Sequence, residues 1–250
     1  MRKPVVSIIT VCYNAKDTIE ATINSVRNQD YENIEYIVVD GASTDGTQDI
    51  IVQNRDAITK YLSEKDNGLY YAMNKGLDMA TGEYVWFLNA GDRIPHGNTL
   101  SKIISSSYIF QDIYYGQTKI IDKQGHTIGK RRLSPPEHLT KNSFKMGMLV
   151  CHQAVIIKRK LVKHYDTRYK ITSDYDWVLS AIERANPQLI RYSHRTYVKF
   201  LEGGLSSKKM NQANKERFKI MINHYGLIQA VFYNMIMSFR FIKSKIKGEL

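Results

Sequence analysis

The sequence predicts an α/β protein: a mostly parallel sheet with helices on both faces, followed by a helical C-terminal extension. Three observations support this fold class. In the first hundred residues, short runs of β-branched and aromatic residues alternate with amphipathic helical segments. Near the end of the chain, a long apolar stretch has the length of a terminal helix. With 250 residues, 43% of them hydrophobic, the chain has room for one large domain and an appendage.

The alternation starts at residues 5–11, a continuous β-branched run typical of a parallel strand that is buried on both faces. A helix is expected from about Ile19 to Val26, because its apolar residues lie three and four positions apart and so share one face. Asp17 or Thr18 is the expected N-cap of this helix.

The same strand–helix pattern then repeats. Residues 35–40 are the second predicted strand, and residues 41–47 are a loop of turn-forming residues. The next helix is expected to run through Ile50, Ile51 and Ile58. Three more elements follow in order: a strand at 61–63, a helix over 69–80 and a strand at 84–88.

Polar loops follow three of these strands, at residues 12–14, 40–45 and 89–92. Because ligands of open parallel sheets bind outside the carboxyl ends of the strands, we expect these loops to lie on one rim and to form a binding site.

The sequence motifs of several other classes of enzyme and metal site are absent. No Gly-x-Gly-x-x-Gly follows the first strand, and there is no Walker-type loop, metal-type Cys-x-x-Cys, His-Glu-x-x-His or Gly-x-Ser-x-Gly. Two cysteines, Cys12 and Cys151, cannot form a disulfide-rich scaffold and suit a reducing compartment. We expect no signal peptide and no membrane span, since no stretch reaches the ~20 apolar residues that a span needs.

Motifs occur in order across roughly residues 4–207, at residues 6–14, 38–47, 66–76, 80–92, 151–153, 173–176 and 202–206. Together these motifs resemble the family 2 glycosyltransferases, whose GT-A fold is Rossmann-like. Within that family, the subgroup that the chain resembles most comprises bacterial enzymes that build O-antigen, colanic-acid-type and capsular polysaccharides.

The resemblance implies an inverting transfer of a hexosyl or N-acetylhexosaminyl group from a nucleoside-diphosphate sugar, with UDP favoured. The implied acceptor is a saccharide linked to undecaprenyl diphosphate at the cytoplasmic face of the inner membrane. Because the leaving diphosphate is an anion, the implied cofactor is Mn²⁺ or Mg²⁺, held by few carboxylates together with phosphate oxygens.

On the donor side, Asp92 matches the last position of the family's metal-binding acidic motif. Asn89 and Gly91 stand where the family often has further acids, which leaves the strength of metal binding open. A turn or helix-cap residue is the structural alternative for Asp92. The donor-binding residues that the resemblance implies are Thr10, Val11, Tyr13, Asp40, Asp66, Asn67, Asn89 and Asp92.

Among these, Asp40 is expected to accept from the nucleotide base, with Thr10, Val11 and Tyr13 as walls of the base site. Taken alone, an aspartate just after a strand is more often an Asx-turn residue.

On the acceptor side, Asp174 matches the family's general base, the carboxylate that takes the proton of the attacking hydroxyl. Ser173 precedes it where the family usually has glutamate. Asp176 is the rival base, and either aspartate could instead cap the helix that follows. His152 and Gln153, with Asp176, are expected to line the acceptor side.

Charge divides the chain into three segments. Residues 1–100 carry a net charge of −5, residues 101–207 carry +10 and residues 208–250 carry +7. We assign residues 1–207 to the transferase domain, with a nucleotide-sugar half and an acceptor half that meet at residue 100. The basic extension is expected either to lie on anionic lipid as a peripheral membrane helix or to pack on the domain or on a second copy in a homodimer.

Two other function classes remain as alternatives. A nucleic-acid-binding module would explain the positive charge, but it would not explain the polar strand-end loops, and no recognition motif is present. We therefore expect no nucleic-acid partner. A nucleotide-binding protein of the same fold without transferase activity is the second alternative, because Asn89, Gly91 and Ser173 replace positions that are often acidic.

Overall fold

A computed structural model describes residues 3–204 and 209–246 of the chain. Its centre is an eight-stranded sheet in the order β3-β2-β1-β4-β7-β5-β6, with β8 paired to β5. The strands are β1 (Val6–Cys12), β2 (Ile34–Asp40), β3 (Lys60–Ser63), β4 (Tyr84–Phe87), β5 (Ile113–Ile121), β6 (Thr127–Lys130), β7 (Val155–Lys158) and β8 (Ile190–Leu201).

The N-terminal half of the sheet is wholly parallel, since β1 pairs with β2 and β4, and β2 pairs with β3. Strand β7 runs antiparallel to both β4 and β5, while β8 is parallel to β5. The predicted α/β class with a mostly parallel sheet is confirmed.

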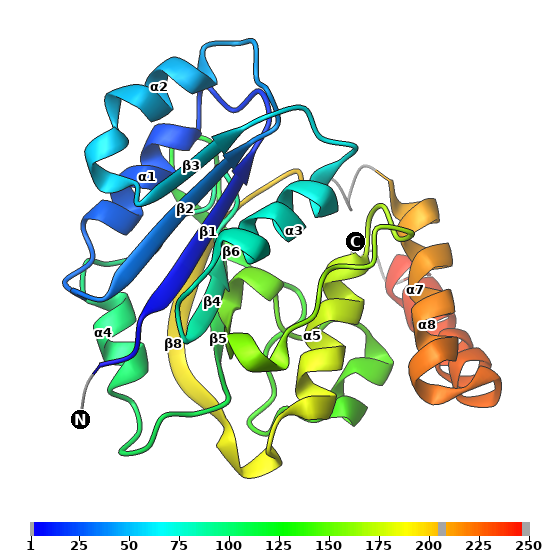
Figure 1. The fold of residues 1–250 in the computed structure, drawn as a ribbon. Helices are drawn as coiled ribbons and strands as arrows, with labels where there is room; N and C mark the ends of the chain where they lie inside the picture. Colours follow the sequence, from blue (N-terminus) through cyan, green and yellow to red (C-terminus); the bar gives the residue numbers. More distant parts are fainter. Residues whose placement is uncertain (1–2, 205–208, 247–250) are drawn as a thin grey trace.

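Helices cover both faces of this sheet (Figure 1). They are α1 (Ile19–Arg27), α2 (Thr47–Gln53), α3 (Leu69–Met79), α4 (Thr99–Ile104) and α5 (Ser173–Arg184). Short 3₁₀ turns connect other segments: η1 (Arg55–Ala57), η2 (Lys141–Met146), η3 (His152–Ala154), η4 (Arg159–Leu161) and η5 (Pro187–Leu189). Every residue of β1 is buried, as a parallel strand between two helical layers requires.

The structure decides one local prediction between its alternatives and corrects another. Thr18, not Asp17, is the N-cap of α1, and its side chain makes no capping hydrogen bond. The second helix does not reach Ile58, because α2 ends at Gln53. There the Asn54 side chain donates to the carbonyl of Ile50 at 2.9 Å, which satisfies a helix-end acceptor and lets the chain turn.

The C-terminal extension forms two helices, α7 (Met210–Tyr225) and α8 (Leu227–Ile246), separated by Gly226 at a φ of 81°. Helix α7 is fixed to the segment just before α5, because the Glu216 carboxylate accepts the backbone N–H groups of Lys170, Ile171 and Thr172 at 2.8–3.1 Å. Helix α8 packs on α7 and leaves much of its own apolar surface exposed.

Candidate active site

The predicted rim exists at the carboxyl ends of β1, β2 and β4. Cys12 and Asp40 are register partners at the ends of β1 and β2. The loop after β4 joins them, because the Ala90 N–H donates to the carbonyl of Val11 at 3.2 Å. The three polar strand-end loops are therefore neighbours in space.

Asp40 lies at the end of β2, beside Cys12 on this rim, and is completely buried. Its Oδ2 accepts from the Ser43 N–H at 3.0 Å and from the Ser63 hydroxyl at 2.7 Å, and its Oδ1 accepts from the Ser43 hydroxyl. These bonds match the Asx-turn alternative. Two serine partners were not anticipated from the sequence, although Ser43 lies only three residues away.

The open part of the rim surrounds Gly41. A Cβ at Gly41 would lie 3.2 Å from the ring of Tyr13 and 3.5 Å from Oδ2 of Asp66, so these two side chains flank the glycine. Tyr13 is 67% exposed and Asn67 is exposed. Asp66 forms an ion pair with Lys75 through Oδ1, while its buried Oδ2 has no hydrogen-bond partner among the described residues.

Thr10 and Val11 do not reach the rim surface, because both are buried within β1. The Thr10 hydroxyl donates to the carbonyl of Leu88 at 2.7 Å and lies 3.0 Å from the Tyr36 hydroxyl. Their side chains are therefore part of the sheet's packing rather than an exposed wall.

Asp92 is 3% exposed, and both of its carboxylate oxygens accept hydrogen bonds. The Leu201 N–H donates to Oδ1 and the Gln153 amide donates to Oδ2, each at 2.9 Å. Burial raises the pKa of Asp92 to about 7 against the opposing effect of these two donors. Gln153, expected on the acceptor side, thus contacts the predicted metal ligand.

Hard divalent cations prefer oxygen donors, and the Asp92 loop offers few of them. Asp92 supplies a carboxylate, and Oδ1 of Asn89 in the same turn is buried without a hydrogen-bond partner among the described residues. Across the described ranges, no group of three or more His, Cys, Asp or Glu side chains could hold a metal ion. The residues present fit a cation whose remaining ligands come from a bound diphosphate.

Asp174 lies in the first turn of α5, close to α3 and η3. Nδ1 of His152 lies 3.1 Å from its Oδ2, and the Tyr70 hydroxyl donates to its Oδ1 at 3.2 Å. Burial alone would raise the pKa of Asp174, but the hydrogen bond and charge of His152 outweigh it and hold the pKa below its usual value. Asp174 is therefore ionised at neutral pH.

Consecutive residues of η3 connect the two sides of the site. His152 contacts Asp174, and the next residue, Gln153, donates to Asp92. Nε2 of His152 is buried and has no hydrogen-bond partner among the described residues. The predicted base and the predicted metal ligand thus contact neighbouring residues of one short turn.

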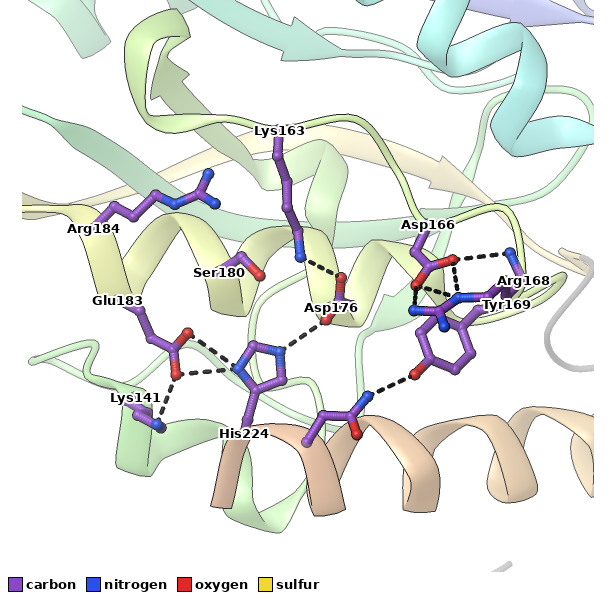
Figure 2. A pocket seen from close by; sticks show the side chains of 11 residues that line it. Lys141, Lys163, Asp166, Arg168, Tyr169, Asp176, Ser180, Glu183, Arg184 and His224 are labelled. Carbon is purple, nitrogen blue, oxygen red and sulfur yellow. Dashed lines mark hydrogen bonds and ion pairs between the residues drawn. The ribbon is translucent and has the colours of Figure 1, made fainter. Parts of the chain in front are cut away.

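Asp176 is not part of this group. Two residues along a helix turn the side chain by ~200°, so Asp176 points away from Asp174 and toward α7. Its carboxylate lies 2.8 Å from Nε2 of His224 and 2.9 Å from Nζ of Lys163, in a pocket of about 430 Å³ (Figure 2). Of the motif at 202–206, Leu205 and Ser206 lie outside the described residues.

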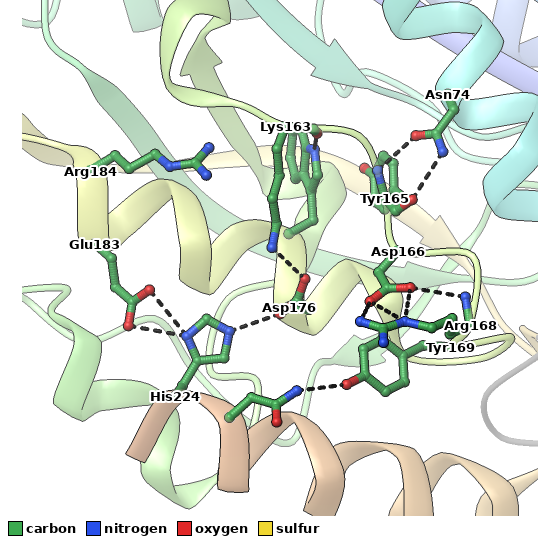
Figure 3. A network of polar contacts seen from close by, with 12 residues as sticks. Asn74, Lys163, Tyr165, Asp166, Arg168, Tyr169, Asp176, Glu183, Arg184 and His224 are labelled. Atoms are coloured by element: carbon green, nitrogen blue, oxygen red, sulfur yellow. Dashed lines mark hydrogen bonds and ion pairs between the residues drawn. The ribbon is translucent and has the colours of Figure 1, made fainter. Parts of the chain in front are cut away.

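This second cluster joins the extension to the domain. Nδ1 of His224 lies 3.1 Å from Glu183, which in turn pairs with Lys141 at 2.6 Å (Figure 3 shows the wider network around Asp176). Burial lowers the pKa of His224, but its hydrogen bonds to Asp176 and Glu183 outweigh burial and raise the pKa above the usual value.

We expect the stability that His224 contributes to depend on pH. A raised folded-state pKa gives stabilisation that is complete below the unfolded pKa of about 6.5 and is lost as pH rises through the folded pKa. Asp176 and Glu183 have lowered pKa values, so their contribution is lost in acid. His224→Gln should therefore lower the melting temperature most near pH 5–6, by the equivalent of about 1–3 kcal/mol.

The matched control is His164→Gln, which removes an exposed histidine paired with exposed Asp78. Calorimetry from pH 4.5 to 9 should show a small, flat difference for this control. A His224→Gln difference that is equally flat would contradict the role of the charged imidazole.

Comparison with known proteins shows the family to which this chain belongs. The family model for "Glycosyl transferase family 2" matches residues 7–166. A "PGL/p-HBAD biosynthesis glycosyltransferase" of Mycobacterium bovis (strain BCG / Pasteur 1173P2) is 31% identical over 217 residues, which are 83% of this chain and 81% of that protein.

Two solved structures share the fold. TarS (residues 1–349) of S. aureus matches with a TM-score of 0.70 at 21% identity, covering 94% of this chain and 72% of that one. Glucosyl-3-phosphoglycerate synthase of Mycobacterium tuberculosis, in complex with Mn²⁺, UDP and glucosyl-3-phosphoglycerate, matches with a TM-score of 0.61 at 13% identity, covering 90% and 81%. Together with the sequence match, they place this chain in glycosyltransferase family 2, as a transferase enzyme with the GT-A fold.

Proposed function

We propose that this protein transfers a hexosyl or N-acetylhexosaminyl group, with inversion, from a UDP-sugar to a lipid-linked glycan in the synthesis of a bacterial surface polysaccharide. The observation that carries the proposal is the η3 turn, where His152 and Gln153 connect Asp174 to Asp92. In this proposal, the Asp92 carboxylate serves the donor and the Asp174 carboxylate serves the acceptor.

The nucleotide would bind at the open rim. Tyr13 offers an exposed ring on which a base can stack, and Asp66 offers a buried oxygen without a partner, suited to an N–H of the base. Asp40 would act mainly by holding the loop that it bonds through Ser43, although a carboxylate has lone pairs left for a further donor. The support from relatives is that TarS has been solved in complex with UDP and with UDP-GlcNAc.

Asp92 and Asn89 would hold a divalent cation, Mn²⁺ or Mg²⁺. When bound, such an ion neutralises charge that develops on the leaving diphosphate. Gln153 would keep the Asp92 carboxylate oriented, since its amide donates to Oδ2 at 2.9 Å.

Asp174 would be the general base. Its carboxylate accepts the proton of the acceptor hydroxyl as that oxygen forms a bond to the anomeric carbon, on the face opposite to the breaking bond to the diphosphate. Tyr70 and His152 fix the carboxylate and keep it ionised. Asp174 therefore begins each cycle able to take a proton.

We also propose that α8 lies on the membrane surface that carries the acceptor. Its apolar residues Ile228, Phe232 and Phe239 are 86%, 52% and 75% exposed, and residues 243–247 of the sequence include three lysines. Of the helices that the structure describes, none is long and apolar enough to cross a bilayer.

Sedimentation with lipid vesicles tests this surface. The protein should bind vesicles that contain anionic phosphatidylglycerol, and Ile228→Ser together with Phe232→Ser should weaken binding at least tenfold. The variant Val52→Ser, which removes an exposed apolar side chain of α2, is the control. Wild-type protein that stays in the supernatant as a dimer would assign the face to a second copy instead.

The transfer activity itself is tested by incubating the protein, Mn²⁺ and a bacterial lipid extract with UDP-glucose, UDP-GlcNAc or GDP-mannose. We expect release of UDP from at least one UDP-sugar and a labelled lipid-linked product. Release from GDP-mannose alone would contradict the proposed donor class.

A further inference from the structure

In a small pocket beside the η3 turn, every charged lining residue is basic. The pocket has a volume of about 90 Å³ and lies between β5, the end of β6 and Cys151. Lys119, Lys130 and Arg131 line it, and none of its ten lining residues is acidic. A volume equal to about three water molecules suits a single phosphate or carboxylate group.

The strand register places these charges side by side. Lys119 of β5 is directly opposite Lys130 of β6, and it is also the register partner of Lys199 on β8. Like charges directly opposite each other destabilise a sheet. No acidic side chain of the described residues forms an ion pair with any of the three. The sheet therefore holds a row of uncompensated lysines.

Arg131 adds a second, independent observation. Its Nη1 is buried and has no hydrogen-bond partner among the described residues. Buried donors are nearly always satisfied, so an unpaired guanidinium nitrogen in a pocket points to a missing acceptor. The planar guanidinium matches the geometry of carboxylate and phosphate oxygens.

The pocket also lies on the acceptor side of the site. Cys151, which lines it, directly precedes His152, the partner of Asp174. Burial raises the pKa of the Cys151 thiol to about 11, and the nearby charge of Arg131 opposes this shift. A group bound here would belong to a molecule whose hydroxyl can approach Asp174.

We propose that this pocket is an anion-binding subsite for the acceptor, in which Arg131, Lys119 and Lys130 bind a phosphate or carboxylate group that the acceptor carries. The inference rests on the proposed function and narrows its substrate class to acceptors with a negative charge near the reacting sugar. The acceptor's negative charge would come from one of two groups: the diphosphate of the lipid carrier or an acidic group within the glycan.

Calorimetric titration of the wild-type chain tests the subsite, with saturating UDP and Mn²⁺ present to fill the donor site. The anionic probes are farnesyl diphosphate and methyl glucuronide, and their neutral counterparts are farnesol and methyl glucoside. Inorganic phosphate serves as the competitor. Binding of farnesyl diphosphate alone assigns the lipid diphosphate, and binding of the glucuronide alone assigns an acidic sugar.

Arg131→Gln should weaken binding of the anionic probe about tenfold or more, as expected for a charged hydrogen bond. The double variant Lys119→Gln/Lys130→Gln should weaken it as well, whereas Lys102→Gln/Lys160→Gln, which removes two exposed lysines elsewhere, should not. Inorganic phosphate should compete with the probe.

Three results would overturn the subsite: no binding of either anionic probe, equal binding of a neutral counterpart, or unchanged affinity in Arg131→Gln. Stabilisation of the same protein by UDP and Mn²⁺ separates the two proposals. If UDP stabilises the chain and the anionic probes do not bind, the donor site stands and the subsite fails; if UDP has no effect, the proposed function fails by itself.

Discussion

Asp174→Asn is expected to lower the rate of sugar transfer by about 100-fold to 10,000-fold, which is the usual contribution of a general base. Asparagine keeps the shape of the side chain and can still bond to Tyr70, but it cannot accept the proton of the acceptor hydroxyl. Affinity for the nucleotide should not change, because Asp174 contacts His152, whereas Asp92 is contacted by Gln153. Initial rates of transfer and calorimetric nucleotide binding, measured on one preparation, separate the two effects.

Asp176→Asn is the matched control on the same helix. Its carboxylate contacts His224 and Lys163, so its loss should lower the melting temperature while transfer at a permissive temperature continues. If Asp174→Asn transfers sugar at the wild-type rate, or if Asp176→Asn alone loses transfer, Asp174 is not the base.

Asp92→Asn should abolish the effect of Mn²⁺ on nucleotide binding. A neutral amide is a much poorer ligand for a hard divalent cation than a carboxylate, and the described part of the chain supplies no acidic cluster to replace it. We expect UDP affinity in Mn²⁺ to fall at least tenfold and sugar transfer to fall with it. Stability without ligand should fall by about 1–3 kcal/mol, because the asparagine NH2 would face one of the two N–H donors that Asp92 now accepts, from Leu201 and Gln153.

Asp56→Asn, which alters an exposed carboxylate paired with Arg27, is the control for this experiment. Titrations of UDP with and without Mn²⁺ give the measurement. A response to Mn²⁺ in Asp92→Asn equal to that of the wild type would assign the metal to other ligands.

The sequence was sufficient to predict the rim because the order of strands and helices along the chain determines where the strand ends lie. Parallel strands joined by helices bring all their carboxyl ends to one edge, so polar residues at 12–14, 40–45 and 89–92 had to meet. This argument needs only the strands and their direction. It does not reveal whether a given side chain is exposed at the edge.

Thr10 shows that limit. Its position in a strand buried on both faces hides the hydroxyl between Leu88 and Tyr36, and no local pattern near Thr10 indicates those partners. Tyr70 is a second example, since it reaches Asp174 from 104 residues away in the chain. Partners at such separations are set by the tertiary fold, which brings the first turn of α3 to the first turn of α5 and which periodicity does not encode.

The position of Asp176 on a different side of the helix from Asp174 was predictable, but its partner was not. Helical geometry already turns residues two apart to different sides, so Asp174 and Asp176 could not both face the acceptor. What the sequence did not indicate was the partner on the other side, because His224 belongs to α7 in the extension and lies 48 residues further along the chain. The extension therefore packs on the domain through one face, while α8 keeps an exposed apolar face.

The proposed function depends above all on a metal-dependent nucleotide site at the ends of β1, β2 and β4. This site is tested by thermal unfolding of the wild-type chain with UDP, GDP, dTDP or CDP, each with and without Mn²⁺. A ligand that binds only the folded state at 100 times its dissociation constant adds about 2.7 kcal/mol of stability. We predict that UDP raises the melting temperature and that Mn²⁺ enlarges the shift. No shift with any of the four nucleotides, or a shift that Mn²⁺ does not change, would contradict the proposed site.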